Sequence, residues 1–279
     1  MKKVLITGAN SYIGTSLEKW LGQYPDNYFV DTVDMIGDSW KEKDFTEFDT
    51  IFHVAGIAHI KETRENSNLY FEVNRDLTYK IAQKAKNDKV KQFIFLSTMG
   101  VYGIENGEID KDTLPNPKSN YGRSKLQAEK LIEPLKADDF KIAILRPPMI
   151  YGKGCKGNYQ RLAKFAINYP LFPNIENKRS MIYIDNLCEF VRLLIDDYNS
   201  GLFFPQNKEY VCTSEMVKMI AEVHGKKIWM TKLFNPLLCT LNNNILNKVF
   251  GNLVYSKNLL NYSEADTIST KETIKMTEM

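Results

Sequence analysis

A glycine-containing loop near the start of the chain restricts the possible folds more than any other stretch. It follows a short apolar run at residues 4–7 and precedes a segment in which Leu17, Trp20 and Leu21 recur at helical spacing. Glycines between a strand and a helix let the backbone approach a pyrophosphate, which the helix N-terminus then holds. The order strand, loop, helix therefore predicts a dinucleotide-binding unit. The loop reads Gly8-Ala9-Asn10-Ser11-Tyr12-Ile13-Gly14.

An acidic residue follows this loop at a suitable distance for an adenosine ribose. The second apolar run, residues 28–33, ends at Asp34, about twenty residues after Gly14. A carboxylate there can accept hydrogen bonds from both ribose hydroxyls of NAD, whereas the 2'-phosphate of NADP would be repelled. We expect a tenfold to hundredfold preference for NAD. NADP stays an alternative, because Lys41 or Lys43 could fold over the phosphate.

Apolar runs and helical patterns alternate through the first half of the chain. Strands are expected at 49–55, 93–97 and 141–145, and helices at 69–85 and 120–135. Nearly unbroken apolar strands that alternate with helices indicate an α/β fold, a Rossmann-like doubly wound parallel sheet. Ligands of such sheets bind beyond the carboxyl ends of the strands. Five residues fall at those ends: Gly8, Asp34, Gly56, Thr98 and Arg146.

The pattern changes after about residue 150. A glycine-rich loop at 152–157 precedes a short strand at 181–184 and helices at 186–196 and 213–224. We therefore predict an NAD(P)-binding Rossmann domain at 1–150 and a smaller α+β substrate-binding region at 151–279. The apolar segment 233–255 is expected to pack on that region or to form a subunit contact rather than to associate with a membrane.

Composition excludes several classes of protein. The 37 basic residues exceed the 34 acidic ones by only three, so a nucleic-acid partner is not indicated. The four cysteines and three histidines lack the spacing of a disulfide framework or a metal site. No signal peptide is recognised, and no apolar run reaches the roughly 18 residues of a spanning helix. A cytoplasmic protein without membrane insertion is expected.

Tyr121 and Lys125 lie four residues apart at the predicted start of a helix, and so on one helix face. A phenol has a pKa near 10, and a nearby cation favours its charged form. Lowering the pKa by about 3 units takes roughly 4 kcal/mol, which a lysine and a positively charged cofactor ring together could supply. Tyr121 is therefore a candidate proton shuttle; an ordinary surface pair has the same spacing.

Taken in order, these landmarks give the chain a family resemblance. It resembles the extended short-chain dehydrogenase/reductases, and among them the NAD-dependent epimerase/dehydratase group that acts on nucleotide sugars. The resemblance covers nearly the whole length. Its matches are Thr7-Gly8, Ile13-Gly14, Asp34, Ala55-Gly56, Asn74, Ser97-Thr98, Val101-Tyr102-Gly103, Tyr121, Lys125, Arg146-Pro147, Arg179, Tyr183-Ile184 and Asn186.

The resemblance implies specific roles. Tyr121 would be the acid/base, with Lys125 and Thr98 completing the catalytic set. Thr98 would also contact the sugar, while Asn158 and Arg179 would bind the nucleotide and diphosphate of a UDP-sugar. The implied cofactor-binding residues are Thr7, Gly8, Asn10, Ser11, Tyr12, Ile13, Gly14, Asp34, Ala55, Gly56, Asn74, Ser97, Tyr121, Lys125 and Pro147.

Ser11 bears on cofactor binding, and the residues after Thr98 bear on the reaction. Ser11 stands where the family usually has glycine, so it either obstructs the pyrophosphate or gives it a hydroxyl contact. Met99 and Gly100 follow Thr98 where dehydratases carry an acid pair, which disfavours dehydration. The implied reaction is reversible hydride transfer at sugar carbon 4 by a UDP-hexose 4-epimerase or a UDP-4-keto-sugar reductase of surface-polysaccharide precursor synthesis. The other class is a non-catalytic dinucleotide-binding sensor or scaffold.

The family usually dimerises through a four-helix bundle, and the matching segments here are 69–85 and 120–135. Both carry apolar residues beyond a single stripe, as suits helices with one face towards a sheet and another towards a partner. A homodimer is expected. The residues concerned include Leu77, Ile81, Leu126, Leu131 and Ile132.

Overall fold

The chain forms two compact units. The computed structural model describes residues 1–58, 60, 62–233, 235–236, 244–259 and 268–279. The first unit comprises Met1–Gly103, Leu114–Pro147 and Leu187–Pro205, and the second Ile104–Thr113, Pro148–Asn186 and Gln206–Met279. The main passage at residue 147 lies close to the boundary predicted at 150. Residues 187–205 then return to the first unit, so most of the helix predicted at 186–196 belongs to this unit and not to the second region, where it was expected.

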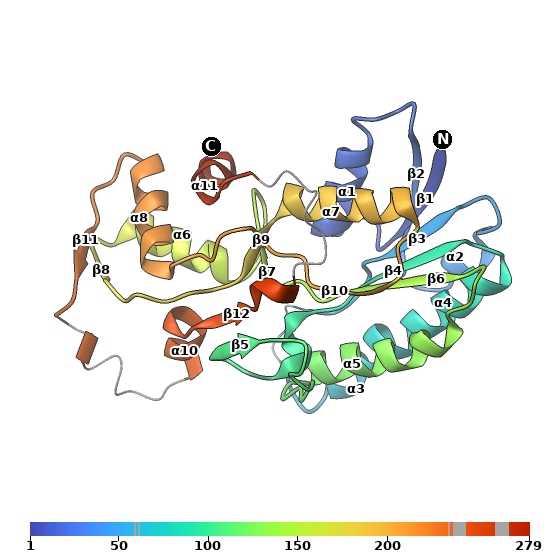
Figure 1. Ribbon diagram of the computed structural model, residues 1–279, viewed down its shortest axis with the longest axis horizontal. Coiled ribbons are helices and arrows are strands. Elements are labelled where there is room, and N and C mark those ends of the chain that lie inside the picture. The colour runs from blue at the N-terminus through green and yellow to red at the C-terminus, as the bar shows by residue number, and fades with distance from the viewer. Residues whose placement is uncertain (59, 61, 234, 237–243, 260–267) are drawn as a thin grey trace. The chain divides into compact units, whose positions relative to one another are not determined.

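The first unit is built on a six-stranded sheet in which every pairing is parallel, in the order β10-β6-β4-β3-β1-β2 (Figure 1). This confirms the predicted α/β fold. The chain leaves β1 on one side for β2 and then crosses to β3 on the other, so β1 and β3 flank the point where the winding reverses. The strands are β1 (Lys2–Thr7), β2 (Tyr28–Val33), β3 (Thr50–His53), β4 (Gln92–Leu96), β6 (Lys141–Leu145) and β10 (Gly201–Phe203).

Helices cover both faces of this sheet. Figure 1 shows α1 and α7 on one face and α3, α4 and α5 on the other. The predicted helix 69–85 is continuous but contains a π-helical turn, η1. The elements are α1 (Tyr12–Leu21), α2 (Ser39–Glu42), α3 (Ser67–Phe71), η1 (Glu72–Leu77), α4 (Thr78–Asn87), η2 (Met99–Tyr102), α5 (Asn120–Ile132), η3 (Glu133–Leu135) and α7 (Ile184–Asp197).

The core of the first unit lies between the sheet and the helices α4 and α5. Leu5 and Ile51 from the strands meet Ile81 from α4 and Ile132 from α5, and all four side chains are fully buried. The inner strands β3 and β4 bury both of their faces, as the unbroken apolar runs predicted, whereas the edge strands β2 and β10 are partly exposed.

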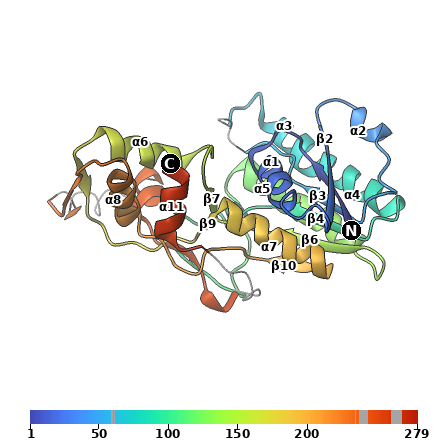
Figure 2. The same ribbon diagram turned by 90° about the horizontal axis from the view of Figure 1, so that it is seen from above.

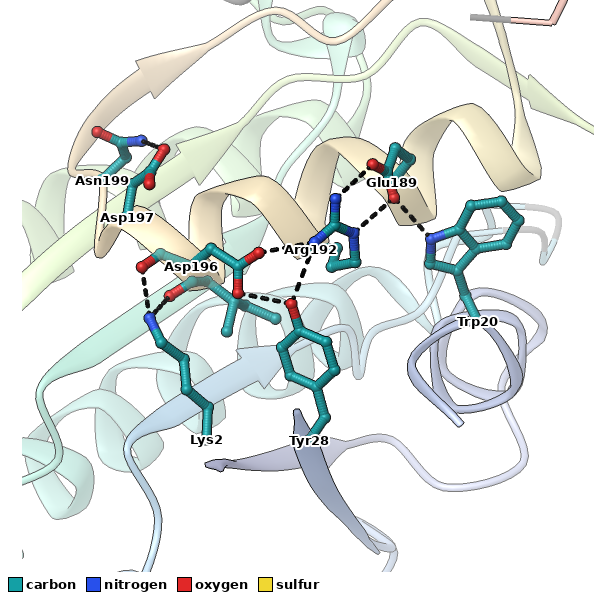
Figure 3. Close-up of polar contacts among 9 residues, drawn as sticks. Lys2, Trp20, Tyr28, Glu189, Arg192, Asp196, Asp197 and Asn199 are labelled. Carbon is teal, nitrogen blue, oxygen red and sulfur yellow. Dashed lines mark hydrogen bonds and ion pairs between the residues drawn. The ribbon is translucent and has the colours of Figure 1, made fainter. Parts of the chain in front are cut away.

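The C-terminal end of α7 is tied to the sheet by polar side chains (Figure 3). The last carbonyls of a helix have no partner within it. Here Lys2 Nζ donates to the carbonyls of Ile195 and Asp196, both at 2.5 Å, and Gln92 Nε2 donates to that of Leu194 at 2.8 Å. The lysine charge also complements the negative end of the helix dipole.

The second unit consists of three two-stranded parallel sheets and four helices among the described residues. In both views of the ribbon α8 lies beside α6 and α11 (Figure 2). At its centre the Tyr151 hydroxyl bonds with Thr273 and accepts from Asn207. The pairs are β7 (Met149–Tyr151) with β9 (Met181–Tyr183), β8 (Leu171–Pro173) with β11 (Trp229–Thr231), and β5 (Gly107–Ile109) with β12 (Leu253–Tyr255); the other elements are α6 (Asn158–Asn168), α8 (Thr213–Val223), α10 (Asn244–Phe250), η4 (Lys257–Leu259) and α11 (Thr270–Glu278).

The predicted apolar segment 233–255 is only partly described. Residues 234 and 237–243 lie outside the described residues, and the remainder supplies α10 and β12. No described helix has both the length and the apolar character required to cross a membrane.

Candidate active site

The loop after β1 is shaped by Gly8. Its backbone has a φ of 105°, and a Cβ placed there would lie 2.9 Å from the backbone nitrogen of Ala55, at the end of β3. A side chain would therefore both strain the loop and push β3 away. Gly8 donates its N–H to Val33 at 2.9 Å, which joins the loop to the end of β2 as well. Glycine at position 8 therefore lets the loop lie close to the backbone at the ends of β2 and β3, where the sheet reverses its winding.

Ser11 turns its side chain onto the helix that it precedes. It is the N-cap of α1, and its Oγ accepts the N–H of Gly14 at 3.1 Å. A Cβ on Gly14 would lie 2.6 Å from that oxygen, so the cap needs glycine three residues on. Because the hydroxyl accepts in this bond, it still carries a proton that it can donate to a phosphate oxygen. The sequence left open whether Ser11 obstructs the pyrophosphate or gives it a hydroxyl contact, and this geometry accommodates the contact.

Asp34 stands exposed at the carboxyl end of β2, where the sequence placed it. One of its oxygens accepts the N–H of Ile36 at 3.0 Å, which orients the carboxylate. The two lysines expected to compete with it are engaged elsewhere. Lys41 pairs with Asp38 at 2.8 Å, and Lys43 pairs with Asp31 at 2.6 Å.

Gly56, Asn74 and Lys125 meet beyond the end of β3. A Cβ on Gly56 would lie 2.9 Å from Asn74 Oδ1 and 3.2 Å from Lys125 Nζ. The amide of Asn74 is fixed on both sides, because it accepts from Ile57 N at 2.7 Å and donates to Ser124 Oγ at 3.1 Å. Asn74 lies within the π-helical turn η1, a local irregularity that is frequent at functional sites. The turn therefore directs this amide into the site.

Tyr121 and Thr98 are brought together by the close packing of two backbones. A Cβ on Gly122 would lie only 2.7 Å from the carbonyl oxygen of Gly100, so glycine lets the first turn of α5 approach η2. The Tyr121 hydroxyl hydrogen-bonds with Thr98, whose Oγ1 also accepts the N–H of Gly100 at 3.1 Å. The predicted catalytic pair is therefore assembled within the first unit.

Two acceptors satisfy the N-terminal N–H groups of α5. Ser119 is the N-cap and accepts from Gly122 N at 3.0 Å. The carboxylate of Glu62 accepts from Asn120 N at 3.1 Å and from Tyr121 N at 3.2 Å. This acid complements the positive end of the helix dipole and fixes the backbone of the tyrosine itself.

The pKa values of the two central groups shift in ways that the sequence did not predict. Burial raises the pKa of Tyr121, and the hydrogen bond from Thr98 opposes that rise. The predicted lowering is thus not a property of the chain alone, and it would need the positive ring of the cofactor. Burial lowers the pKa of Lys125 to about 7, against the attraction of Glu129. The lysine is 4% exposed, and its Nζ donates to the carbonyl of Leu96 at 2.8 Å.

A buried ion pair, Arg146 with Glu129, lies next to the predicted catalytic residues of the chain. Arg146 Nη2 lies 2.6 Å from Glu129 Oε2, and its Nε donates to the other carboxylate oxygen at 3.1 Å. Ser97 donates to the same carboxylate, and Arg146 Nη1 donates to the Tyr102 hydroxyl at 2.8 Å. Ser97, predicted to bind the cofactor, thus directs its side chain to this pair.

Thr7 and His53 form a second buried network. Thr78 Oγ1 donates to the carbonyl of Asn74, so it accepts from His53 Nε2, and Thr7 then donates to His53 Nδ1 at 2.6 Å. Burial is the main cause that lowers the pKa of His53 to about 3, so the ring is neutral. The hydroxyl of Thr7, also predicted to bind the cofactor, is therefore used inside the protein, and only its backbone borders the loop.

The other predicted cofactor residues line the same strand ends. Asn10 has a positive φ of 63° in the exposed part of the glycine loop, and Tyr12 and Ile13 form the first turn of α1. Ala55 follows β3, and the carbonyl of Pro147 accepts from Met99 N at 2.9 Å.

The two residues predicted to bind the nucleotide part of the substrate lie in the second unit. Asn158 is exposed at the first position of α6. Arg179 donates to the carbonyls of Gly251 at 3.0 Å and Asn247 at 3.4 Å, at the C-terminal end of α10. Burial lowers the pKa of this guanidinium, and Glu105 opposes the change. Its contact with a diphosphate remains a prediction.

With this geometry in place, comparison with known proteins decides the family. Residues 4–204 match the model of the NAD dependent epimerase/dehydratase family. The chain belongs to this family. Membership confirms the expected class of enzyme and NAD as the expected cofactor.

Individual relatives of this epimerase/dehydratase-family enzyme agree with the family match. It is 29% identical to a UDP-glucose 4-epimerase of Vibrio cholerae, over 98% of this chain and 90% of that one. It is 26% identical to an N-acetyl-alpha-D-glucosaminyl-diphospho-ditrans,octacis-undecaprenol 4-epimerase of Escherichia coli O157:H7, over 84% and 76%. The fold matches that of UDP-glucuronic acid 4-epimerase from Bacillus cereus, with a TM-score of 0.76 at 21% identity over 99% and 97% of the two chains.

Among the residues that the structure describes, no group of three or more His, Cys, Asp or Glu side chains could hold a metal ion. One of the three histidines, His59, and one of the four cysteines, Cys239, lie outside that part of the chain.

Proposed function

We propose that the protein is a 4-epimerase of a hexose carried on a diphosphate, with a UDP-hexose as the first candidate substrate. The observation that carries the proposal is the set of Thr98, Tyr121 and Lys125 at the carboxyl edge of the sheet, with a hydrogen bond already joining the first two. The UDP-glucose 4-epimerase among the relatives supports the choice of reaction.

The residues at the strand ends suit a bound dinucleotide. Gly8 and Gly56 leave space that a Cβ would fill, and the N-terminus of α1 faces the glycine loop. We assign the pyrophosphate to this loop and the adenosine ribose to Asp34. NAD, when bound, supplies the acceptor and donor of the hydride at sugar carbon 4.

The chain's own residues handle the proton. Tyr121, in its charged form, takes the proton of the 4-hydroxyl while the hydride leaves carbon 4. Thr98, within hydrogen-bonding reach of the phenol, holds the same sugar oxygen. After the ketone has presented its other face, Tyr121 returns the proton as the hydride returns. In our proposal Lys125 and the positive ring of NAD together favour the phenolate, against the burial that raises the pKa of Tyr121.

The diphosphate carrier of the sugar is proposed less narrowly than the reaction. Uridine diphosphate and undecaprenol diphosphate both occur in the names of the relatives. Asn158 and Arg179, in the second unit, are our candidates for contacts with a nucleotide and a diphosphate. Arg179 would have to exchange its bonds to two carbonyls for phosphate oxygens.

The test is conversion of UDP-glucose to UDP-galactose by the purified protein without added cofactor, followed by chromatography. Epimerisation without net use of reduced cofactor would support the proposal. Stoichiometric oxidation of NADH or NADPH with a UDP-4-keto-sugar would favour a reductase instead. If dinucleotide binds but neither reaction occurs with UDP- or polyprenyl-diphosphate sugars, the protein is a sensor or scaffold. Mass spectrometry of nucleotides released from the protein adds a second readout, because an epimerase retains its NAD.

We also propose that the protein is a homodimer through two segments, residues 69–85 in α3, η1 and α4, and residues 120–135 in α5 and η3. Ile81 and Ile132 are fully buried against the sheet, whereas Leu69 and Leu131 are 40% and 39% exposed. In this proposal the two exposed leucines pack against the partner subunit. A monomeric mass by light scattering at micromolar concentration would contradict the dimer.

A further inference from the structure

One small sheet in the second unit has two apolar faces. Strands β8 and β11 pair with Leu171 opposite Trp229. Phe172 points to the inner side, where its ring packs edge-on against Phe165 at 5.1 Å and lies 5.6 Å from that of Phe250. A two-stranded sheet with a buried inner face ordinarily carries polar residues outside, because successive side chains alternate between the faces.

The outer face departs from that rule. Alternation places Leu171 and Trp229 on it, and two further exposed apolar residues lie just outside the strands, Tyr169 before β8 and Leu233 after β11. The exposed fractions of Tyr169, Leu171, Trp229 and Leu233 are 57%, 40%, 74% and 78%. We call this set the apolar face. Its strand β11 lies in the segment 225–233, which carries exposed Lys226, Lys227 and Lys232 and no acidic residue.

We propose that the apolar face, with its three lysines, binds the surface of an anionic lipid bilayer without spanning it. A tryptophan and a tyrosine beside leucines suit the boundary between headgroups and acyl chains, where an aromatic ring can be half buried. The lysines are attracted by the negative surface potential of anionic lipids. The proposal does not depend on the proposed epimerase activity.

The charges argue against a second copy of the chain as the occupant. A twofold interface would set the same patch against itself and bring six lysines together with no acid from segment 225–233 to offset them. The acid that precedes the segment, Glu222, lies 3.9 Å from Lys218, and Glu278 in α11 bonds with His224 and Tyr159. An anionic surface is complementary where a second copy is not.

The test is binding of the full-length protein to vesicles of phosphatidylcholine with and without about a third phosphatidylglycerol. We expect sedimentation with the anionic vesicles only, weakened by salt, and a blue shift of tryptophan fluorescence. Trp40 is buried and Trp20 bonds with Glu189, so the shift reports mainly on Trp229.

Three variants make the test specific. Trp229→Ser with Leu233→Ser should weaken binding by about tenfold or more. Replacement of Lys226, Lys227 and Lys232 by glutamine should also weaken it by at least about tenfold and remove the preference for anionic lipid. Leu114→Ser removes a leucine that is 83% exposed in the first unit and should change nothing.

The proposal is overturned if wild type does not bind the anionic vesicles, if the double serine variant binds them as well as wild type, or if neutral vesicles bind equally. It is also overturned if the double variant dissociates a dimer that forms without lipid, because a second copy would then cover the face. Circular dichroism of each variant confirms that it is folded.

Discussion

Two arginine–glutamate networks in the first unit use the same chemistry at different depths. Arg146 and Glu129 lie behind the catalytic set with side chains 8% and 5% exposed, and Arg192 and Glu189 lie on α7 with both side chains 20% exposed. Each arginine also reaches a tyrosine, Tyr102 in the first case and Tyr28 in the second (Figure 3).

The two networks differ in the groups that they hold in place. The α7 network joins Glu189 to Trp20 of α1, and Asp196 to Tyr28 of β2 at 2.5 Å, so it fastens a helix to its neighbours. The Arg146 network holds Ser97, the neighbour of Thr98, and its glutamate acts on Lys125. A buried charge that loses its partner costs several kcal/mol, whereas a partly exposed one costs little. Matched substitutions in the two networks should therefore differ in size and in kind.

The largest effect is expected from removal of one hydroxyl at the catalytic edge. Tyr121→Phe should lower turnover by a factor of about 100 to 10,000, the range for loss of a positioned acid/base, while stability stays near normal. The control is Tyr28→Phe, which should cost about 1 kcal/mol of stability and leave turnover unchanged. Steady-state kinetics and thermal unfolding measure both; a Tyr121→Phe protein with most of its activity would remove this residue from the mechanism.

The two glutamates provide the second comparison. Glu129→Gln leaves Arg146 buried without its counter-charge, so we expect a loss of about 3–5 kcal/mol. It also removes the attraction that keeps the pKa of Lys125 from falling further, so activity should decline at a lower pH than in wild type. Glu189→Gln should cost at most about 1 kcal/mol and leave the pH profile unchanged. Denaturant unfolding and pH–rate profiles distinguish the two variants. Equal losses of stability would mean that burial does not separate the two networks.

His53 gives a test by pH. Its folded pKa of about 3 lies below the value near 6.5 expected in the unfolded chain, so protons favour unfolding. The stability that it contributes is complete above pH 6.5 and is lost as the pH falls towards 3. Between pH 7 and pH 5 this loss is about 2 kcal/mol. His53→Gln should flatten that slope, as measured by denaturant unfolding at pH 5 and pH 7.

The smallest effect concerns cofactor choice at the edge of the site. Wild-type protein should bind NADH at least about tenfold more tightly than NADPH, and Asp34→Ala should reduce this ratio. Asp31→Ala, three residues earlier, removes the partner of Lys43 instead and should leave the preference for NADH in place or lower it slightly. Fluorescence titration measures each; equal affinities in wild type would mean that Asp34 does not select the cofactor.

The sequence predicted the main strands because each is an apolar run long enough to recognise. β10 escaped prediction, since three residues that include Gly201 at the sheet edge carry no periodicity. The proposed catalytic and cofactor-binding positions were predicted from motifs, but the partners of their side chains were not. Thr7 and Ser97 bond inwards to His53 and Glu129, groups that the motifs do not mention.

The residues that were missed lack a local signal. Glu129 is one acid on an amphipathic helix, and by pattern alone it faces solvent; its buried partners, Arg146 at the end of β6 and Ser97 after β4, come from other elements. Glu129 lies four residues after Lys125, and this spacing was the sequence signal that could have predicted their interaction on one helix face. Glu62 reaches α5 from a loop 58 residues earlier, a distance that no periodicity spans. The pKa of Tyr121 was predicted from its lysine neighbour, and burial was the stronger influence.

The passage of the chain between its two units has a consequence for engineering. It crosses five times, after residues 103, 113, 147, 186 and 205. A single cut near residue 150 would take β10 and most of α7 away from the sheet, and with them the partners of Lys2 and Gln92. Grafting the second unit of a relative onto this protein would therefore require replacement of three separate segments, 104–113, 148–186 and 206–279. In a recombination library with one crossover at 150, Lys2 and Gln92 of this chain would have to bond with the α7 of a relative.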